Sequence, residues 1–266
     1  GAVLGFHSSM DDQGEPHPER TAVYLQLGKE IDRLSEWLID TRPAPEVAVL
    51  YSQNTRNFYG GADQLTVDYS FLGTEQMLAE AHIDTEFVLD HQLDEEHLKN
   101  VRVLVMPNAA CLTRDQADAV RAYVENGGAL LATGETSLYD EDGNLREEFA
   151  LSDVFGVSYK GVHPKVEEAQ KNKRLRRYPF TLCAHEITER LEPANITRLP
   201  WFDIEVREDR EPLATWCDVR EDTCWACVNG GLEIAGDSGM PLIVVGEYGN
   251  AKVCYIPAFI TSNYVI

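Results

Sequence analysis

The stretch Val101-Arg-Val-Leu-Val-Met-Pro-Asn108, then Thr113-Arg-Asp-Gln116, then Gly127-Gly-Ala-Leu-Leu-Ala-Thr-Gly134, decides the fold. Its two apolar runs predict buried strands, and the residues between them predict a helix. Thr113 and Gln116 have the spacing of a capping box at the helix start, and Gly127 suits the left-handed position at its end. The stretch therefore predicts a right-handed strand–helix–strand crossover. One apolar stripe of the helix is made by Ala117, Val120 and Val124.

The same alternation extends toward the amino terminus, where apolar runs predict strands at 46–52 and 85–90 and helices at 69–81 and 94–99. Strands alternating with helices indicate a parallel sheet covered on both faces. The predicted fold class is α/β, a three-layer, doubly wound and mostly parallel sheet. A β-rich C-terminal addition is expected after residue 160, with a short helix at 151–157 before it and strands at 201–207, 213–219, 241–247 and 251–256.

The first residues form a separate segment. Residues 7–19 are polar and predict a loop, and residues 20–40 predict a helix with an apolar face. Thr41-Arg-Pro-Ala-Pro45 is a short, stiff linker. We therefore expect residues 1–44 to stand apart from a main domain at 45–266.

Charge is the strongest deviation in composition, because 23 Lys and Arg face 45 Asp and Glu, a net charge of −22. Phosphate groups would be repelled, which argues against nucleic acid and anionic membranes as partners. The acidity indicates either a well-solvated surface or a host with a salty cytoplasm. The local exception is a basic cluster, which predicts a solvated loop or a contact with an acidic surface of another subunit: Lys160, Lys165, Lys171, Lys173, Arg174, Arg176 and Arg177.

Six cysteines in 266 residues do not make a disulfide scaffold. Reduced thiols and a cytoplasmic location are the expectation. No apolar run approaches the roughly 20 residues of a membrane-spanning helix, and no basic leader precedes the polar residues after Phe6.

Several motifs follow one another in a familiar order: His7-Ser-Ser-Met-Asp-Asp-Gln-Gly14, Leu27-x-x-Glu30-Ile31-x-x-Leu34, Pro43-x-x-Glu46-Val-Ala-Val-Leu-Tyr51, Leu104-Val-Met-Pro107, Tyr123-Val-Glu-Asn-Gly-Gly128 and Glu247-Tyr-Gly-Asn-Ala-Lys-Val-Cys-Tyr255. This succession resembles the end of the catalytic barrel and the following trimerisation domain of glycoside hydrolase family 42 β-galactosidases and related glycosyl hydrolases. The similarity covers residues 1–134 and 241–257.

The resemblance implies a class I glutamine-amidotransferase-like domain at 45–266 that holds a homotrimer together and helps to wall in active sites. Residues 1–44 would be the remnant of the end of a catalytic barrel plus a linker helix. The two catalytic glutamates of the family lie on earlier barrel strands, so no catalytic residue is expected here. His7 would contact the sugar, but Val3-Leu-Gly-Phe6 lacks the acidic residue that precedes this histidine in the family. Galactose specificity is therefore not implied.

Two catalytic or metal sites compete with this interpretation. In an amidotransferase-type enzyme the nucleophile would stand in the turn Thr133-Gly-Glu-Thr-Ser137, which has no cysteine. A free-standing hydrolase could instead use Cys111 with His185 as base and Glu186 as orienting carboxylate. A zinc site is the other alternative, although zinc is usually held by two close pairs of ligands and only one Cys-x-x-Cys pair is present. The residues of the right type are Cys183, His185, Cys217, Cys224 and Cys227.

A carbohydrate-binding module is a third alternative. The loop with Tyr59-Gly60-Gly61 follows the first strand of the parallel sheet, at the edge where such folds gather ligands. Neighbouring carboxylates such as Glu95-Glu96 and Glu147-Glu148 are most simply solvated charges. Aromatic residues that could stack on sugars, or fill the core, are Trp201, Phe202, Trp216 and Trp225. The favoured prediction is a non-catalytic oligomerisation domain without metal or cofactor, with carbohydrate contact at His7, Tyr59, Gly60 and Gly61.

Overall fold

The computed structural model describes residues 14–15, 17–40, 45–59, 64–164, 177–191, 195–198, 202–219 and 234–263. The chain divides into two compact units, Gly1–Ala44 and Pro45–Ile266. The described part of the first unit is mainly one helix, α1 (Pro18–Leu38), which has Pro18 in its first turn, where a missing N–H costs nothing.

A nine-stranded sheet forms the centre of the described part of the second unit, in the order β2-β1-β3-β4-β11-β10-β9-β6-β7. The five strands from β2 to β11 run parallel, and the four beyond them are antiparallel. Strands β5 and β8 pair separately. The bounds are β1 Val47–Tyr51, β2 Thr85–Leu89, β3 Val103–Pro107, β4 Ala129–Thr133, β5 Val157–Val162, β6 Arg177–Leu182, β7 Asn195–Arg198, β8 Phe202–Val206, β9 Glu211–Val219, β10 Ile234–Tyr248 and β11 Ala251–Ile256.

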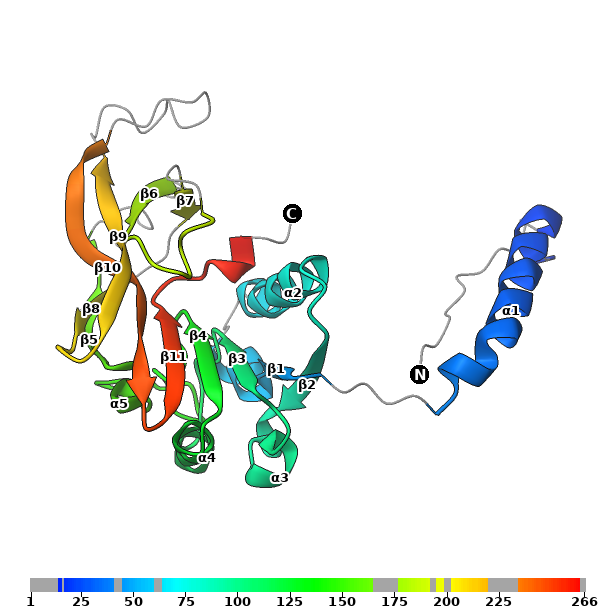
Figure 1. Cartoon of the computed structure of the whole chain (residues 1–266), viewed down its shortest axis with the longest axis horizontal. Helices are drawn as coiled ribbons and strands as arrows, with labels where there is room; N and C mark the ends of the chain where they lie inside the picture. Colours follow the sequence, from blue (N-terminus) through cyan, green and yellow to red (C-terminus); the bar gives the residue numbers. More distant parts are fainter. Residues whose placement is uncertain are drawn as a thin grey trace. The chain divides into compact units, whose positions relative to one another are not determined.

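Helices cover both faces of the parallel strands, which confirms the predicted three-layer α/β class (Figure 1). Helix α2 lies on one face beside the 3-10 turn Thr261–Asn263, and α4 and α5 lie on the other. The helices are α2 Gln64–Glu80, α3 Glu95–Leu98, α4 Arg114–Glu125 and α5 Ser152–Phe155, and shorter turns are the π-helical Thr55–Tyr59 and the 3-10 Asp90–Gln92.

The capping box predicted for α4 is present. The Thr113 hydroxyl accepts the backbone N–H of Gln116 at 3.1 Å, and the Gln116 side chain accepts the N–H of Thr113 at 2.8 Å. Gly127 ends the helix with φ +101°. The apolar stripe is buried as expected, because Ala117, Val120 and Val124 belong to the core.

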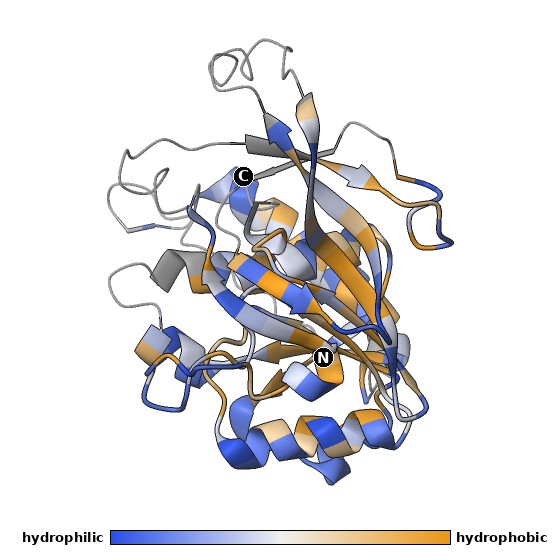
Figure 2. Ribbon diagram, turned by 90° about the vertical axis from the view of Figure 1, so that its left-hand side faces the viewer, coloured by the Kyte–Doolittle hydropathy of each residue, from blue (hydrophilic) through white to orange (hydrophobic). Residues whose placement is uncertain are grey.

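The main core lies between the sheet and the helices α4 and α5, and Figure 2 shows its hydrophobic residues concentrated on the central strands. Phe155 of α5 stacks on Tyr255 of β11 with ring centroids 4.4 Å apart. The Tyr255 hydroxyl donates to the carbonyl of Gly134 at 2.7 Å, so a large ring is buried with its polar atom satisfied.

The C-terminal addition departs most from the sequence prediction. Within the expected β-rich addition, the sequence predicts no individual strand at the positions of β5, β6 and β7, and the basic stretch contains the start of β6 at Arg177. Helix α2 begins at Gln64, earlier than residue 69, and β10 begins at Ile234, earlier than residue 241. Register shifts interrupt the β10–β9 pairing near Asp237.

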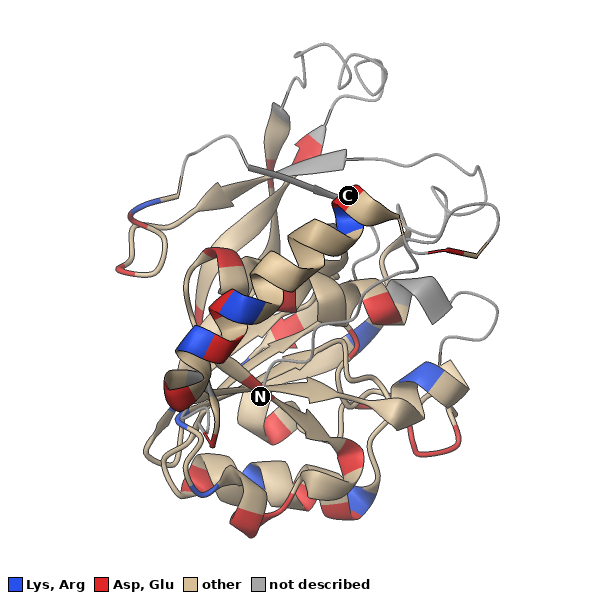
Figure 3. Cartoon of the chain, turned by 90° about the vertical axis from the view of Figure 1, so that its right-hand side faces the viewer, with Lys and Arg blue, Asp and Glu red and all other residues tan. Residues whose placement is uncertain are grey.

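Acidic residues are spread over helices and turns on the face in Figure 3, while both signs alternate along α1. Within the parts of the chain that the structure describes, no helix combines the length and apolarity that crossing a bilayer requires.

Candidate functional site

Three loops meet at the carboxyl edge of the parallel strands, where folds of this class gather their ligands. They follow β1 (residues 52–59), β3 (108–112) and β4 (134–139). Three residues in these loops have positive φ, Asn108 at +49°, Gly134 at +62° and Ser137 at +68°. A Cβ on Gly134 would lie 2.5 Å from both the Asn108 amide oxygen and the Phe259 ring, so only glycine fits.

Glu135 is at the centre of this edge. Its backbone N–H donates to the Asn108 side-chain oxygen at 2.9 Å, and the Tyr59 hydroxyl donates to its carboxylate. The ring of Tyr59 packs edge-on against Tyr139 at a centroid distance of 4.9 Å. The loops after β1 and β4 are thus joined through one carboxyl group.

The environment favours the neutral forms of these groups. Burial raises the pKa of the Glu135 carboxyl by more than the hydrogen bonds from Tyr59 and Tyr139 lower it. Burial, followed by the nearby Glu135 charge, raises the pKa of the Tyr59 hydroxyl far above its ordinary value. The packing therefore favours the neutral form of Glu135 more than water does.

Backbone amides at the same edge already have acceptors. The N–H of Asn108 donates to the Thr133 hydroxyl at 3.2 Å, and that of Ala109 to the Thr136 hydroxyl at 3.1 Å. The N–H of Cys111 donates to the Thr55 hydroxyl at 3.0 Å. Acyl-transfer chemistry needs preorganised donors aimed at a developing oxyanion. These donors instead hold the loops to one another.

Cys111 is poorly suited to nucleophilic catalysis. Its residue is fully buried. Burial, and then the negative charges of Asp140 and Asp90, raise the pKa of its thiol to about 12. The thiolate is the nucleophile, so a reactive cysteine needs the opposite shift.

The predicted partners of Cys111 lie elsewhere. Glu186 pairs with Lys252, near the amino end of β11, at 3.5 Å, whereas Cys111 follows the carboxyl end of β3. The His185 Nδ1 accepts the backbone N–H of Ile187 at 3.1 Å. Both residues line a groove of about 1120 Å³ over β4, β10 and β11 that does not include Cys111. The structure does not assemble the Cys111–His185–Glu186 triad.

Metal binding finds no support in the described part of the chain. There, no group of three or more His, Cys, Asp or Glu side chains is placed to hold an ion. Cys183 is exposed and Cys217 is buried, both as free thiols. Cys224 and Cys227 lie outside the described residues, so the zinc hypothesis for that pair stays a prediction.

Of the predicted sugar-contacting residues, the structure describes Tyr59, while His7, Gly60 and Gly61 lie outside the described ranges. The hydroxyl of Tyr59 is engaged by Glu135. The aromatic residues Phe202 and Trp216 are buried in the core and have no face free for a sugar. The other two candidates, Trp201 and Trp225, are not described.

Sequence reasoning singled out Tyr59 and the turn at Glu135 separately but did not pair them. The two residues are 76 positions apart, and no local pattern connects them. The available signal was the position of each, because both follow buried parallel strands whose carboxyl ends share one edge.

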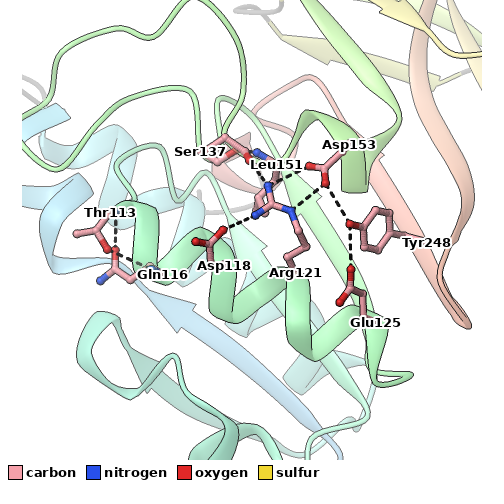
Figure 4. Close-up of polar contacts among 10 residues, drawn as sticks. Thr113, Gln116, Asp118, Arg121, Glu125, Ser137, Leu151, Asp153 and Tyr248 are labelled. Atoms are coloured by element: carbon pink, nitrogen blue, oxygen red, sulfur yellow. Dashed lines mark hydrogen bonds and ion pairs between the residues drawn. The ribbon is translucent and has the colours of Figure 1, made fainter.

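A second polar cluster joins α4 to α5 and to the β10–β11 hairpin (Figure 4). Arg121 contacts Asp153 at 2.8 Å and Asp118 at 2.6 Å, and it donates to the carbonyl of Ala150 at 2.7 Å. The Tyr248 hydroxyl donates to Asp153 at 3.1 Å. Burial opposes the charge of Asp153, but the hydrogen bond and charge of Arg121 prevail and lower its pKa. This cluster is a structural clamp.

Comparison with known proteins identifies the family to which the sequence and the fold are related. The sequence profile described as "Beta-galactosidase trimerisation domain" matches residues 45–265. β-Galactosidase BgaA of Planococcus sp. (strain 'SOS Orange') is 27% identical and β-galactosidase BgaP of Planococcus sp. (strain L4) 25% identical, each over the whole of this chain. The chain spans 36% of the length of each of these two relatives.

Among solved structures, the β-galactosidase from Bacillus circulans sp. alkalophilus superimposes with a TM-score of 0.66 at 17% identity. The superposition covers 96% of this chain and 34% of that one, and it shows that the two share a fold. Because the family profile spans most of the sequence, the chain belongs to the β-galactosidase trimerisation domain family.

Proposed function

We propose that residues 45–266 hold three copies of a β-galactosidase-type glycoside hydrolase together and perform no bond-breaking chemistry themselves. The observation that carries the proposal is the family match over 45–265. The carboxyl edge supports it, because Glu135 is bonded to Tyr59 and the amides beside it are committed to the hydroxyls of Thr55, Thr133 and Thr136.

Residues 1–44 are, in this proposal, the end of the catalytic barrel and its linker helix. Helix α1 exposes large apolar side chains, among them Val23, Leu25 and Trp37. Such side chains need a covering surface, which the rest of a barrel would provide. Hydrolysis of the glycosidic bond would then depend on carboxylates outside this chain. Contact of His7 and of the Tyr59-Gly60-Gly61 loop with a sugar in that active site belongs to the same proposal.

The proposed setting is the cytoplasm. Among the described residues, Cys111, Cys183, Cys217 and Cys254 are free thiols, which suits a reducing compartment.

Sedimentation of the 266-residue chain tests the assembly role. The expected species has three times the monomer mass of 29.8 kDa. A chain that stays monomeric from low to high micromolar concentration would refute the proposal. The non-catalytic role is tested separately with a chromogenic β-galactoside and with glutamine. Turnover of glutamine that disappears in Cys111→Ala would instead establish the amidotransferase-like alternative.

A further inference from the structure

Apolar side chains are exposed unevenly on the second unit. Among its described residues, eleven large hydrophobic side chains are exposed, and seven of them lie between Phe58 and Leu89. The remaining four are scattered between residues 145 and 191. Single exposed apolar residues are normal on protein surfaces, but a concentration in one short segment indicates an interaction site.

Six of the seven belong to helix α2, the turn after it and the edge strand β2. We call this set the α2–β2 surface. It lies at the right of the second unit in Figure 1, the side that faces the reader in Figure 3. Its members are Tyr69, Leu72, Met77, Ile83, Phe87 and Leu89.

Ring contacts join the two elements that carry this surface. Phe71 of α2 meets Phe87 of β2 edge-on at a centroid distance of 5.2 Å and Tyr51 of β1 at 4.9 Å. The Thr85 hydroxyl donates to Glu75 of α2 at 3.0 Å. Phe87 is nevertheless 58% exposed, and Leu72, which follows Phe71 in α2, is 48% exposed. The two elements are therefore in contact, while Phe87 and Leu72 remain largely exposed.

The size of the surface suits a protein contact. A large aromatic side chain presents roughly 150–250 Å², so the exposed fractions of the six residues leave several hundred Å² of apolar area. A standard interface buries about 800 Å² on each partner, of which the apolar centre is a part. Strand β2 also ends the sheet, so its outer edge has no partner strand among the described residues.

We infer that the α2–β2 surface is the face through which this domain packs against a second copy of the chain. The inference rests on the proposed function and names the contact that assembly uses. The occupant follows from the extent of the family match, because the region described as a trimerisation domain is residues 45–265. The apolar surface that its described residues leave uncovered is concentrated on α2 and β2. A threefold ring joins two different faces of each subunit, so this surface meets another face of its neighbour.

Sedimentation velocity of the 266-residue chain with Phe87→Asp and Leu72→Asp tests the inference. Each variant places a charge in the apolar centre and is expected to weaken self-association at least tenfold. The matched control is Ile187→Asp, which makes the same change in charge at a residue that is 51% exposed elsewhere on the unit. Far-UV circular dichroism and thermal melts establish that each variant is folded.

Hydrogen exchange of the unmodified chain gives a second measurement that needs no substitution. Amides of residues 69–89 are expected to become protected as the protein concentration rises. The inference is overturned when the unmodified chain associates and neither variant weakens that association. Protection that is confined to other segments overturns it as well. Either result leaves the proposed function intact. An unmodified chain that never associates removes both.

Discussion

Replacing Glu135 with glutamine tests whether the carboxyl edge of the parallel strands favours the neutral form of this side chain. Glutamine keeps an oxygen that accepts the Tyr59 hydroxyl, but it cannot ionise. Because burial raises the pKa of Glu135 above its ordinary value of 4.5, the folded chain holds its proton more tightly than the unfolded chain does. The native protein is therefore most stable, with respect to this group, below pH 4.5, where both states are protonated.

The sign and size of the effect follow from linkage. As the pH rises above 4.5, the unfolded chain ionises first and the native protein loses stability until the folded pKa is passed. Each unit by which the pKa is raised corresponds to about 1.4 kcal/mol, or about 3–5 °C in the melting temperature of a domain of this size. The Glu135→Gln variant does not have this loss. Its advantage over the parent should grow with pH and then level off.

Urea denaturation of both proteins between acidic and neutral pH measures the difference. Glu147→Gln is the control, because it removes the same charge from an exposed position in the connection between β4 and α5. A difference that stays constant with pH, or a variant that becomes less stable than its parent as the pH rises, would show that the native environment does not favour a neutral Glu135.

Three further predictions follow. Arg121→Ala should lower the free energy of unfolding by about 1–2 kcal/mol at neutral pH, since the partly buried Asp153 loses its cation. Because the native pKa of Asp153 is lowered, this loss should shrink as the pH falls through that pKa, which chemical denaturation checks. Gly127→Ala should cost about 1–2 kcal/mol from positive φ alone. Gly134→Ala should cost roughly 1–3 kcal/mol more, because its Cβ would lie 2.5 Å from Phe259, and equal melting temperatures would contradict this account. Self-association should strengthen from low to molar salt, because copies with a net charge of −22 repel one another, and sedimentation at both salt concentrations measures this.

The parallel half of the sheet could be predicted because its signals are local. Thr113 and Gln116 define the start of α4, Gly127 defines its end, and the apolar runs on either side become β3 and β4. Buried parallel strands are apolar on both faces, so the pattern stands out.

The antiparallel extension could not be predicted in the same way. Strand β6 begins at Arg177 within a basic stretch, and it is held by pairing with β7 and with β9, which lies more than 30 residues further along the chain. Strand β10 contains Gly236 and Gly239 and is accommodated by register shifts, so its sequence has no regular alternation. The contact between Glu135 and Tyr59 could not be predicted for a related reason, because the two residues meet only after the sheet has formed.

The position of β11 has a consequence for synthesis. This strand comes last along the chain among the described strands, yet it lies between β4 and β10 and pairs with both. In a nascent chain that stops before residue 251, the edges of β4 and β10 that pair with β11 have no partner strand. Phe155 also lacks the Tyr255 ring on which it stacks. The ribosome must therefore deliver residues 251–256 before the two halves of the sheet can close. Truncated products would expose unpaired, aggregation-prone strand edges and become substrates for proteases.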